Sequence, residues 1–566
     1  MSNVYGQQEG YSYPPSSSTA HLAGDGEKPM TGQRSSFSPT VAGGKKRSPW
    51  LWIGIAVAAI VVILAAVLGG VLGSRAANDN NKNNSVKDNS AAAADGSSGS
   101  GTGTASGASA SSTAEPAGPL INIVDLPAWN WGQNKSIGMC LGSWLILEKW
   151  MLPDWFNETV NAVQDGAGAT ALDEWSFCEV LGQDRAKEAL TEHFNNFITE
   201  DDIETLYQHG INQLRIPTGF WAWIPTTGDE PYVNDQALYQ GQIERVLGYA
   251  YQRGMYAIID AHGLPGSQNG EQSSGQLTEN PSWFGSSADT LTPNQQRSDE
   301  MVKAMTEWLA KTPYRSVVTG IEVINEPRPY TNDQFDQLFD YYERSYATIQ
   351  SSAWPVTTFL HNGYSNMTFF HDFAAAHATD PPSMAMVDHP YPGNFPVQNN
   401  SADILSQVCT AAARYLEYPI PIVIDEWSLY TGVKDAEFEE DFYKQQLVTW
   451  AWSAGGHFCT YSWITLLGNS STVIPSPSDY GLNGTTSSQN AQAYLQALTD
   501  ELTSSCGSVP DNVAPYAGTA TVSSWVAEQS ARSSAAGQTL TATETTATSA
   551  APTATVRHKR AVPMRA

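Results

Sequence analysis

Two apolar, β-branched runs that each end in a glutamate constrain the fold of this chain more than any other feature. They are Ile321–Pro327, which reads Ile-Glu-Val-Ile-Asn-Glu-Pro, and Pro421–Trp427, which reads Pro-Ile-Val-Ile-Asp-Glu-Trp. An ionisable group at the end of a buried strand is costly unless chemistry uses it. In a (β/α)8 barrel, strands far apart in the sequence bring their last residues to the same face. Glu326 and Glu426 are therefore expected to face each other there.

The sequence around these runs alternates helical and strand patterns. A helix is expected to start at the Thr199–Asp202 box, to bury Ile203 and Leu206, and to stop at Gly210 directly before a strand. Repetition of this order predicts an α/β fold, a (β/α)8 TIM barrel. The eight expected strands are Ile137–Gly142, Ile211–Ile216, Tyr256–Asp260, Gly320–Ile324, Val356–Leu360, Met384–Asp388, Pro421–Asp425 and His457–Trp463.

Composition divides the chain into successive regions. Residues 1–49 are polar and lack apolar periodicity, which predicts a disordered tail. Residues 50–73 carry no charge and are long enough to cross ~30 Å of hydrocarbon, so a single transmembrane helix is expected rather than a buried core helix. A Ser/Gly/Ala-rich stem (74–119), the folded catalytic domain (120–506) and a Ser/Thr/Ala-rich tail (507–566) follow.

Sequons and cysteines predict the orientation of this expected span. Basic residues flank it on both sides, so the positive-inside rule decides little. Every Asn-x-Ser/Thr sequon follows the span, which favours a cytosolic N-terminus and a catalytic domain outside, in a type II single-pass arrangement. The five cysteines are odd in number, so at least one thiol is expected to stay unpaired. The sequons lie at Asn83, Asn134, Asn157, Asn366, Asn399, Asn469 and Asn483.

Charge and composition limit the classes of partner. The formal net charge of −28 disfavours nucleic acid and anionic membrane surfaces, and it suits a neutral ligand. The 18 Trp residues suit both core packing and stacking on sugar rings. The cysteines lack metal-ligand spacing, and neither a metal nor a cofactor is expected.

The expected strand ends collect polar and aromatic side chains, as an active site does. Singly, each has a simpler explanation: Arg215 can anchor a carboxylate, His262 and His389 can be hydrogen-bonded core residues, and Trp463 can be packing. Together with two facing carboxyls, they indicate glycosidic bond cleavage, in which one carboxyl protonates the leaving oxygen and the other attacks or activates water. The strand-end residues are Glu148, Arg215, His262, Asn325, Glu326, Asn362, His389, Tyr391, Glu426 and Trp463.

Short motifs between Trp131 and Cys506 occur together in one enzyme family. They are Gly142-Ser143-Trp144-Leu145-x-Leu147-Glu148, Thr199-Glu200-Asp201, Leu214-Arg215-Ile216-Pro217, His262-Gly263-x-Pro265-Gly266-Ser267-Gln268-Asn269-Gly270, Asn325-Glu326-Pro327, His389-x-Tyr391 and Glu426-Trp427-Ser428. Through them the chain resembles glycoside hydrolase family five, and within it the fungal exo-β-1,3-glucanases. The combination of motifs is highly specific.

This resemblance implies a retaining mechanism with Glu326 as the acid/base and Glu426 as the nucleophile, their carboxyls ~5–5.5 Å apart. Arg215 and Tyr391 are expected to keep Glu426 ionised. The neighbouring charge of Glu426 is expected to raise the pKa of Glu326.

The resemblance also implies the substrate contacts and one disulfide. Asn325 is expected to hold the 2-hydroxyl of the sugar, and Trp463 is expected to lie under the ring. Glu148, His262 and His389 are expected among the groups that bind the substrate. In the family, a C-terminal cysteine is tied back to the helix before the nucleophile strand, which implies a Cys409–Cys506 bridge.

The implied function is removal of glucose from the non-reducing ends of cell-wall β-1,3-glucan by a monomer at the plasma membrane, with the catalytic domain facing the wall. The chain departs from the family at Glu271, where an aromatic residue is usual, at Pro392-Gly393, and at Ile464–Leu466. These departures leave the linkage preference open, so β-1,6-glucanase activity is an alternative. A second alternative is a membrane-tethered, glucan-binding protein whose barrel has lost catalysis.

Overall fold

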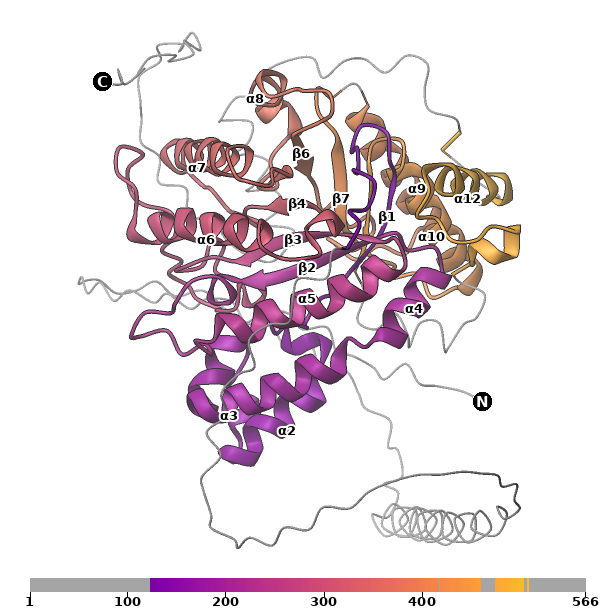
Figure 1. Ribbon diagram of the computed structural model, residues 1–566. Helices are drawn as coiled ribbons and strands as arrows, with labels where there is room; N and C mark the ends of the chain where they lie inside the picture. The colour runs from indigo at the N-terminus through magenta and orange to yellow at the C-terminus, as the bar shows by residue number, and fades with distance from the viewer. Residues whose placement is uncertain (1–122, 417, 460–473, 503–505, 508–566) are drawn as a thin grey trace, which may run out of the picture. The chain divides into compact units, whose positions relative to one another are not determined.

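The computed structural model describes residues 123–416, 418–459, 474–502 and 506–507. These residues form a closed barrel of parallel strands in which each strand pairs with the next and β8 pairs with β1 (Figure 1). The strands are β1 (Ser136–Cys140), β2 (Gln213–Gly219), β3 (Tyr256–Gly263), β4 (Val318–Glu322), β5 (Thr357–His361), β6 (Met384–Val387), β7 (Ile422–Trp427) and β8 (Gly455–Phe458). The predicted (β/α)8 fold and its eight strands are confirmed.

The strand boundaries differ from the expected ones at both catalytic candidates. β4 ends at Glu322, so Asn325 and Glu326 lie on the loop that follows it. β7 runs through Trp427, so Glu426 lies within the strand instead of directly after it. The loop position gives Glu326 a positive φ of 47°, which an L-residue adopts only when its surroundings hold it there.

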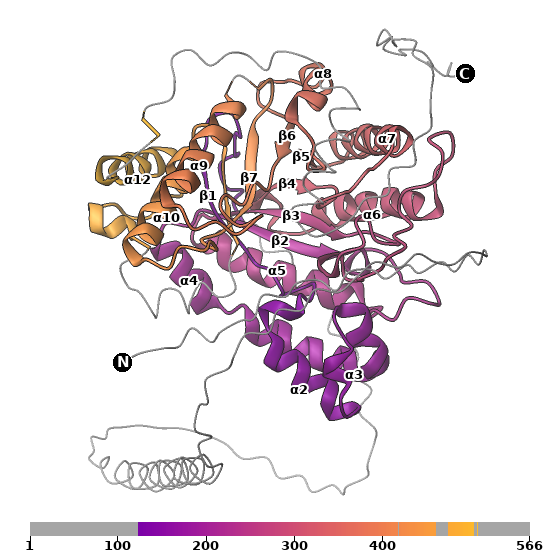
Figure 2. The ribbon, with the colours of Figure 1, turned by 180° about the vertical axis from the view of Figure 1, so that it is seen from behind.

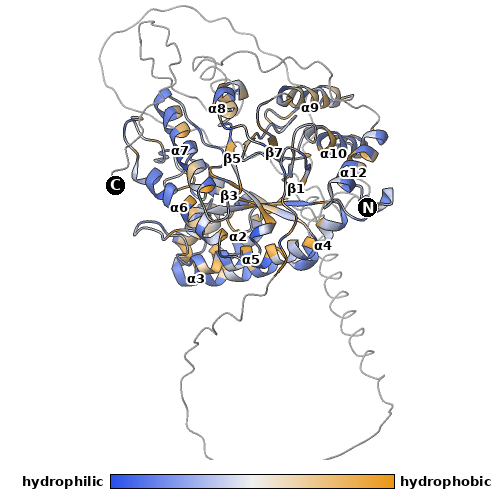
Figure 3. Ribbon diagram, turned by 45° about the horizontal axis from the view of Figure 1, so that its top comes forward, coloured by the Kyte–Doolittle hydropathy of each residue, from blue (hydrophilic) through white to orange (hydrophobic). Residues whose placement is uncertain are grey.

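Helices surround the strands (Figures 2 and 3). The expected helix at Thr199 is α4, and the Thr199 side chain and Asp202 form a reciprocal capping box at its start. The main helices are α2 (Pro153–Val163), α3 (Glu174–Phe197), α4 (Glu200–Gln208), α5 (Gln236–Gln252), α6 (Pro293–Leu309), α7 (Asn332–Gln350), α8 (His371–Ala376), α9 (Ser401–Tyr415), α10 (Ala436–Trp450) and α12 (Ser488–Glu501).

Glycines inside the strands make room for large neighbours. A Cβ on Gly320 of β4 would lie 2.1 Å from the ring of Phe359, and one on Gly138 of β1 would lie 2.2 Å from the ring of His457. Both rings are fully buried. The missing side chains therefore let an aromatic ring from an adjacent strand fill the space, at the cost of the backbone entropy that glycine loses on folding.

Two disulfides are present. Cys409–Cys506 is confirmed, and it joins α9 to the segment after α12. The second, Cys140–Cys459, joins the end of β1 to the residue after β8, the two strands that close the barrel. Cys178 is a buried free thiol, so the expectation of at least one unpaired cysteine is confirmed.

Several expectations concern residues outside the described part of the chain. They include the transmembrane segment, the stem, the two tails apart from Gly507, and the sequons at Asn83 and Asn469. Among the residues that are described, no helix combines the length and apolar character needed to cross a membrane. Three described sequons are at exposed asparagines, namely Asn366, Asn399 and Asn483.

Candidate active site

The strand-end side chains meet at one end of the barrel, around Arg215 of β2. Its guanidinium is fully buried and contacts carboxylates from three other strands: Asp260 of β3, Glu322 of β4, and Asp425 and Glu426 of β7. Burial lowers the pKa of Arg215, but these four acids outweigh burial and raise it well above its usual range. Arg215 is therefore a permanent positive charge on which the site is built.

Glu426 is held by two of its expected partners. Arg215 Nη1 donates to Glu426 Oε1 at 2.5 Å, and the Tyr391 hydroxyl donates to Glu426 Oε2 at 2.7 Å. Burial raises the pKa of Glu426, but the charges of His389, Arg215 and His262 lower it to about 2. The carboxylate is therefore ionised at neutral pH, as a nucleophile must be.

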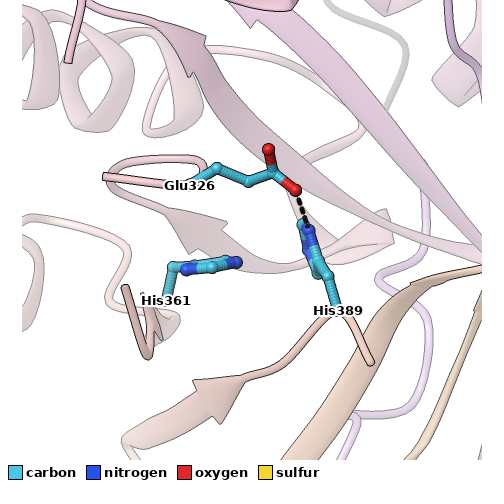
Figure 4. A group of neighbouring side chains, drawn as sticks. All are labelled: Glu326, His361 and His389. Carbon is cyan, nitrogen blue, oxygen red and sulfur yellow. Dashed lines mark hydrogen bonds and ion pairs between the residues drawn. The ribbon is translucent and has the colours of Figure 1, made fainter. Parts of the chain in front are cut away.

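Glu326 lies beside His389, and the two side chains point toward each other in Figure 4. His389 Nδ1 is 2.8 Å from Glu326 Oε1 and 3.6 Å from Glu426 Oε2. Burial and the charge of Glu426 raise the pKa of Glu326, but the hydrogen bond and the charge of His389 lower it to about 2. The expectation that Glu426 would leave Glu326 with a raised pKa is wrong, because the hydrogen bond and the opposite charge of His389 outweigh burial and the charge of Glu426.

A second contact anchors His389 from the far side of its ring. Nε2 lies 2.7 Å from Asp425 Oδ1, and both side chains are inaccessible to solvent. Burial lowers the pKa of His389, but Glu426, Asp425 and Glu326 raise it well above its usual range. Both ring nitrogens therefore carry hydrogens that point at carboxylates.

Sequence reasoning missed Asp260, Glu322, His361 and Asp425. Burial, together with Asp260 and Asp425, raises the pKa of Glu322 well above its usual range despite Arg215. Glu322 Oε1 and Asp425 Oδ2 are buried and accept no hydrogen bond among the described residues, although Arg215 Nε forms an ion pair with Asp425 Oδ2 at 3.2 Å. A proton shared between the two acids would satisfy both oxygens. The available signal was an acid or histidine inside an otherwise apolar strand, which is costly to bury without a partner.

His262 and Asn325 are oriented by the same cluster. His262 Nδ1 lies 2.7 Å from Asp260 Oδ2, which leaves Nε2 toward Asn325 at 3.5 Å. Arg215 Nη2 donates to Asn325 Oδ1 at 2.8 Å, so the amide nitrogen of Asn325 faces away from the guanidinium. That orientation suits donation to a sugar hydroxyl.

Glu148 lies on the β1 side of the site. The Trp150 indole donates to Glu148 Oε2 at 3.0 Å. Burial raises the pKa of Glu148 to about 7, partly offset by the charge of His262. The charges of His262, Glu326 and Glu426 also act on this carboxyl, so Glu148 belongs to the same site. Trp463 lies outside the described residues.

Two groups of side chains have the composition of a metal site, Glu326–His361–His389 and Glu322–His389–Asp425. Both depend on His389, whose nitrogens are already engaged by Glu326 and Asp425. In the first group, His361 Nδ1 accepts from the Gly363 N–H at 2.9 Å, so the neutral ring carries its hydrogen on Nε2. Internal bonds therefore already engage His361 Nδ1 and both nitrogens of His389, whereas the acids keep free lone pairs.

The chain is similar to known glycosidases. The sequence model described as "Cellulase (glycosyl hydrolase family 5)" matches residues 180–465. A protein of Schizosaccharomyces pombe named "Glucan 1,3-beta-glucosidase 1" is 33% identical over 304 residues, which are 53% of this chain and 70% of that protein. A "Probable glucan 1,3-beta-glucosidase A" of Aspergillus terreus is 34% identical over 296 residues, 51% of this chain and 65% of that protein.

Among solved structures, the rutinosidase of Aspergillus niger matches with a TM-score of 0.51 at 20% identity, covering 59% of this chain and 91% of that one. At this identity the match supports the barrel fold alone. A (β/α)8 barrel with two carboxyls at the strand ends is the framework of a glycosidase. The chain belongs to glycosyl hydrolase family 5.

Proposed function

We propose that the protein is a retaining exo-β-1,3-glucosidase that releases glucose from the non-reducing ends of β-1,3-glucan. The carrying observation is that one atom, His389 Nδ1, lies near both Glu326 and Glu426. One oxygen of each glutamate therefore lies against the same ring nitrogen, which favours the ~5–5.5 Å carboxyl separation of retaining enzymes over the wider ~6.5–9.5 Å separation of inverting enzymes. The names of the curated relatives support β-1,3-glucan as substrate.

The geometry supports a role for each glutamate. Glu426, ionised beside Arg215, attacks the anomeric carbon, while Glu326 gives a proton to the leaving oxygen. Glu326 then takes a proton from the water that releases the sugar from Glu426. Asn325 is oriented to hold a hydroxyl of the sugar bound between them.

Cleavage of β-1,6-glucan is the second candidate, and one ion pair favours it. Glu271, which stands where an aromatic residue is expected, lies 2.9 Å from Arg328, two residues after Glu326. Groups beside the acid/base face the leaving sugar, so a charged pair there alters which linkage fits.

Laminarin and pustulan separate the two substrates. We expect the purified protein to release glucose as the first product from laminarin, a β-1,3-glucan, and little product from pustulan, a β-1,6-glucan. Oligomers from pustulan alone would favour the second candidate. Binding of glucan without hydrolysis of any β-glucan or aryl β-glucoside would leave a glucan-binding protein as the function.

We further propose that residues 50–73 anchor the protein in the plasma membrane, with residues 1–49 in the cytosol and the barrel facing the cell wall. The two disulfides support this orientation, because such bonds persist in oxidising compartments. Protease added to intact microsomes is expected to remove only the N-terminal segment, and removal of N-glycans should lower the mass of the protected part. Digestion of the barrel with the N-terminus protected would reverse the orientation.

A further inference from the structure

The side chains around His389 form a chain of hydrogen bonds that runs through the acid/base. Asp425 Oδ1, His389 Nε2, His389 Nδ1 and Glu326 Oε1 follow one another at 2.7 Å and 2.8 Å across the ring. Ionised carboxylates have only lone pairs, so two such contacts to one imidazole need two protons. Either His389 is an imidazolium between two carboxylates, or it is neutral and one of the acids is protonated.

The surroundings of His389 decide where these protons lie. Its anionic neighbours are Glu326, Glu426 and Asp425, and Arg215 contacts both acids of β7. The fourth carboxyl close to it is Glu322, which burial, with Asp260 and Asp425, keeps protonated. The other rings beside it are Tyr391, which donates to Glu426, and His361, whose ring centroid is 4.5 Å away. Burial, followed by the charge of His389, lowers the pKa of His361 well below its usual range, so that ring stays neutral. The net surroundings of His389 favour the imidazolium in the resting enzyme.

A glutamate that is ionised at rest must receive a proton before it can act as an acid. We propose that Asp425 is a positioning residue that keeps a proton on His389, and that Glu326 draws on this proton in each catalytic cycle. The inference rests on the proposed role of Glu326 as the acid/base. The side chain of Asp425 contacts Arg215 and His389, so its effect on the reacting atoms is indirect.

The proton balance closes over one turnover. In the first half, the Nδ1 proton of His389 moves to Glu326 and from there to the leaving oxygen, while Glu426 forms a bond to the anomeric carbon and the carbon–oxygen bond breaks. His389 is then neutral and keeps the hydrogen on Nε2, which still points at Asp425. In the second half, water attacks the same carbon, Glu426 leaves, and the water proton passes through Glu326 back to Nδ1.

The test compares two substrates that differ in their need for a proton. A β-1,3-linked disaccharide needs protonation of its leaving oxygen, whereas 2,4-dinitrophenyl β-glucoside does not. We expect D425N to lower kcat/KM for the disaccharide about 10-fold or more. For the dinitrophenyl glucoside, kcat/KM should stay within about 3-fold of the wild-type value. The basic limb of the disaccharide profile should move to lower pH, because removing one anion lets the Glu326–His389 pair lose its proton earlier.

D260N is the matched control. Asp260 is as buried as Asp425 and contacts the same arginine, but its histidine partner is His262. D260N should change kcat/KM by a similar factor for both substrates and leave the basic limb of the pH profile in place. An equal loss on both substrates with D425N, or an unmoved limb, would overturn the inference and leave Asp425 a structural role.

Two further measurements separate the possible failures. If E326Q also failed to discriminate between the substrates, the proposed role of Glu326 would fall, rather than the role of Asp425 alone. If D425N did not fold, the pH dependence of kcat/KM for the wild-type enzyme would still test the proposal. A basic limb for the disaccharide in the ordinary carboxyl range, around pH 4–5, would mean that no proton is held on His389 for catalysis.

Discussion

At the scale of single residues, the site is a balance between burial and charge. Five acids lie around Arg215 and His389, and their protonation differs, although three are fully buried and the side chains of the other two, Glu326 and Glu426, are only 14% exposed. Glu426 is ionised because the charges of His389, Arg215 and His262 outweigh burial, whereas Glu322 keeps its proton because burial, together with the charges of Asp260 and Asp425, outweighs Arg215. The different protonation states of these carboxyls therefore arise from their positions and not from residue type.

The two catalytic glutamates should fail in different ways. Glu426→Ala should abolish hydrolysis, because no covalent intermediate can form, while an α-glucosyl fluoride should still be used for transfer. Glu326→Ala should lower glucan cleavage by ~10²–10⁴ and still cleave dinitrophenyl glucoside. Azide added to Glu326→Ala should give the β-glucosyl azide, identified by its NMR coupling. An α-azide from this variant, with the β-azide from Glu426→Ala, would exchange the two roles.

At the scale of elements, α3 is joined to the β1 side of the site through a buried acid at its first residue. Glu174 Oε2 accepts from the Leu147 N–H at 2.8 Å, directly before Glu148. Burial raises the pKa of Glu174 to about 8, although the hydrogen bond from the Leu147 N–H lowers it. The carboxyl is therefore protonated at neutral pH in the folded protein and ionised in the unfolded one.

This linkage predicts how stability changes with pH. A raised pKa makes the contribution of Glu174 complete below about pH 4.5 and lost progressively as the pH rises toward 8. Wild-type protein should therefore lose about 3 kcal/mol between pH 4.5 and 7 that Glu174→Gln does not lose. Urea unfolding at both pH values measures the difference. Glu179→Gln, at an exposed position of the same helix, is the control, and parallel pH dependence in all three proteins would contradict the claim.

At the scale of the whole molecule, the barrel is closed both by hydrogen bonds and by a covalent link. β1 pairs with β8 over four residues, and Cys140–Cys459 joins the same two strands across 319 residues of sequence. Cys409–Cys506 spans 97 residues and lies on the outer layer of helices. A cross-link over a longer loop removes more entropy from the unfolded chain.

Removing each bridge should therefore destabilise the protein to a different extent. The C140S/C459S variant should lose up to ~5–6 kcal/mol and the C409S/C506S variant up to ~4–5 kcal/mol in the loop-entropy model. Urea unfolding under non-reducing conditions gives both values. An equal or smaller loss for the barrel-closing pair would mean that native packing, and not chain entropy, governs its contribution.

Local sequence determined the barrel, its eight strands, the helix cap at Thr199, and Glu326 and Glu426 as the candidates, because strand and cap signals lie within a few neighbouring residues. The Cys409–Cys506 pair came from family resemblance. Only the tertiary structure decided that Cys140 pairs with Cys459, and that Asp425, Glu322 and His361 belong to the site. It also reversed the expected pKa shift of Glu326. The physical reason is that electrostatic effects depend on distances of a few ångströms between strands, and a linear pattern does not contain those distances.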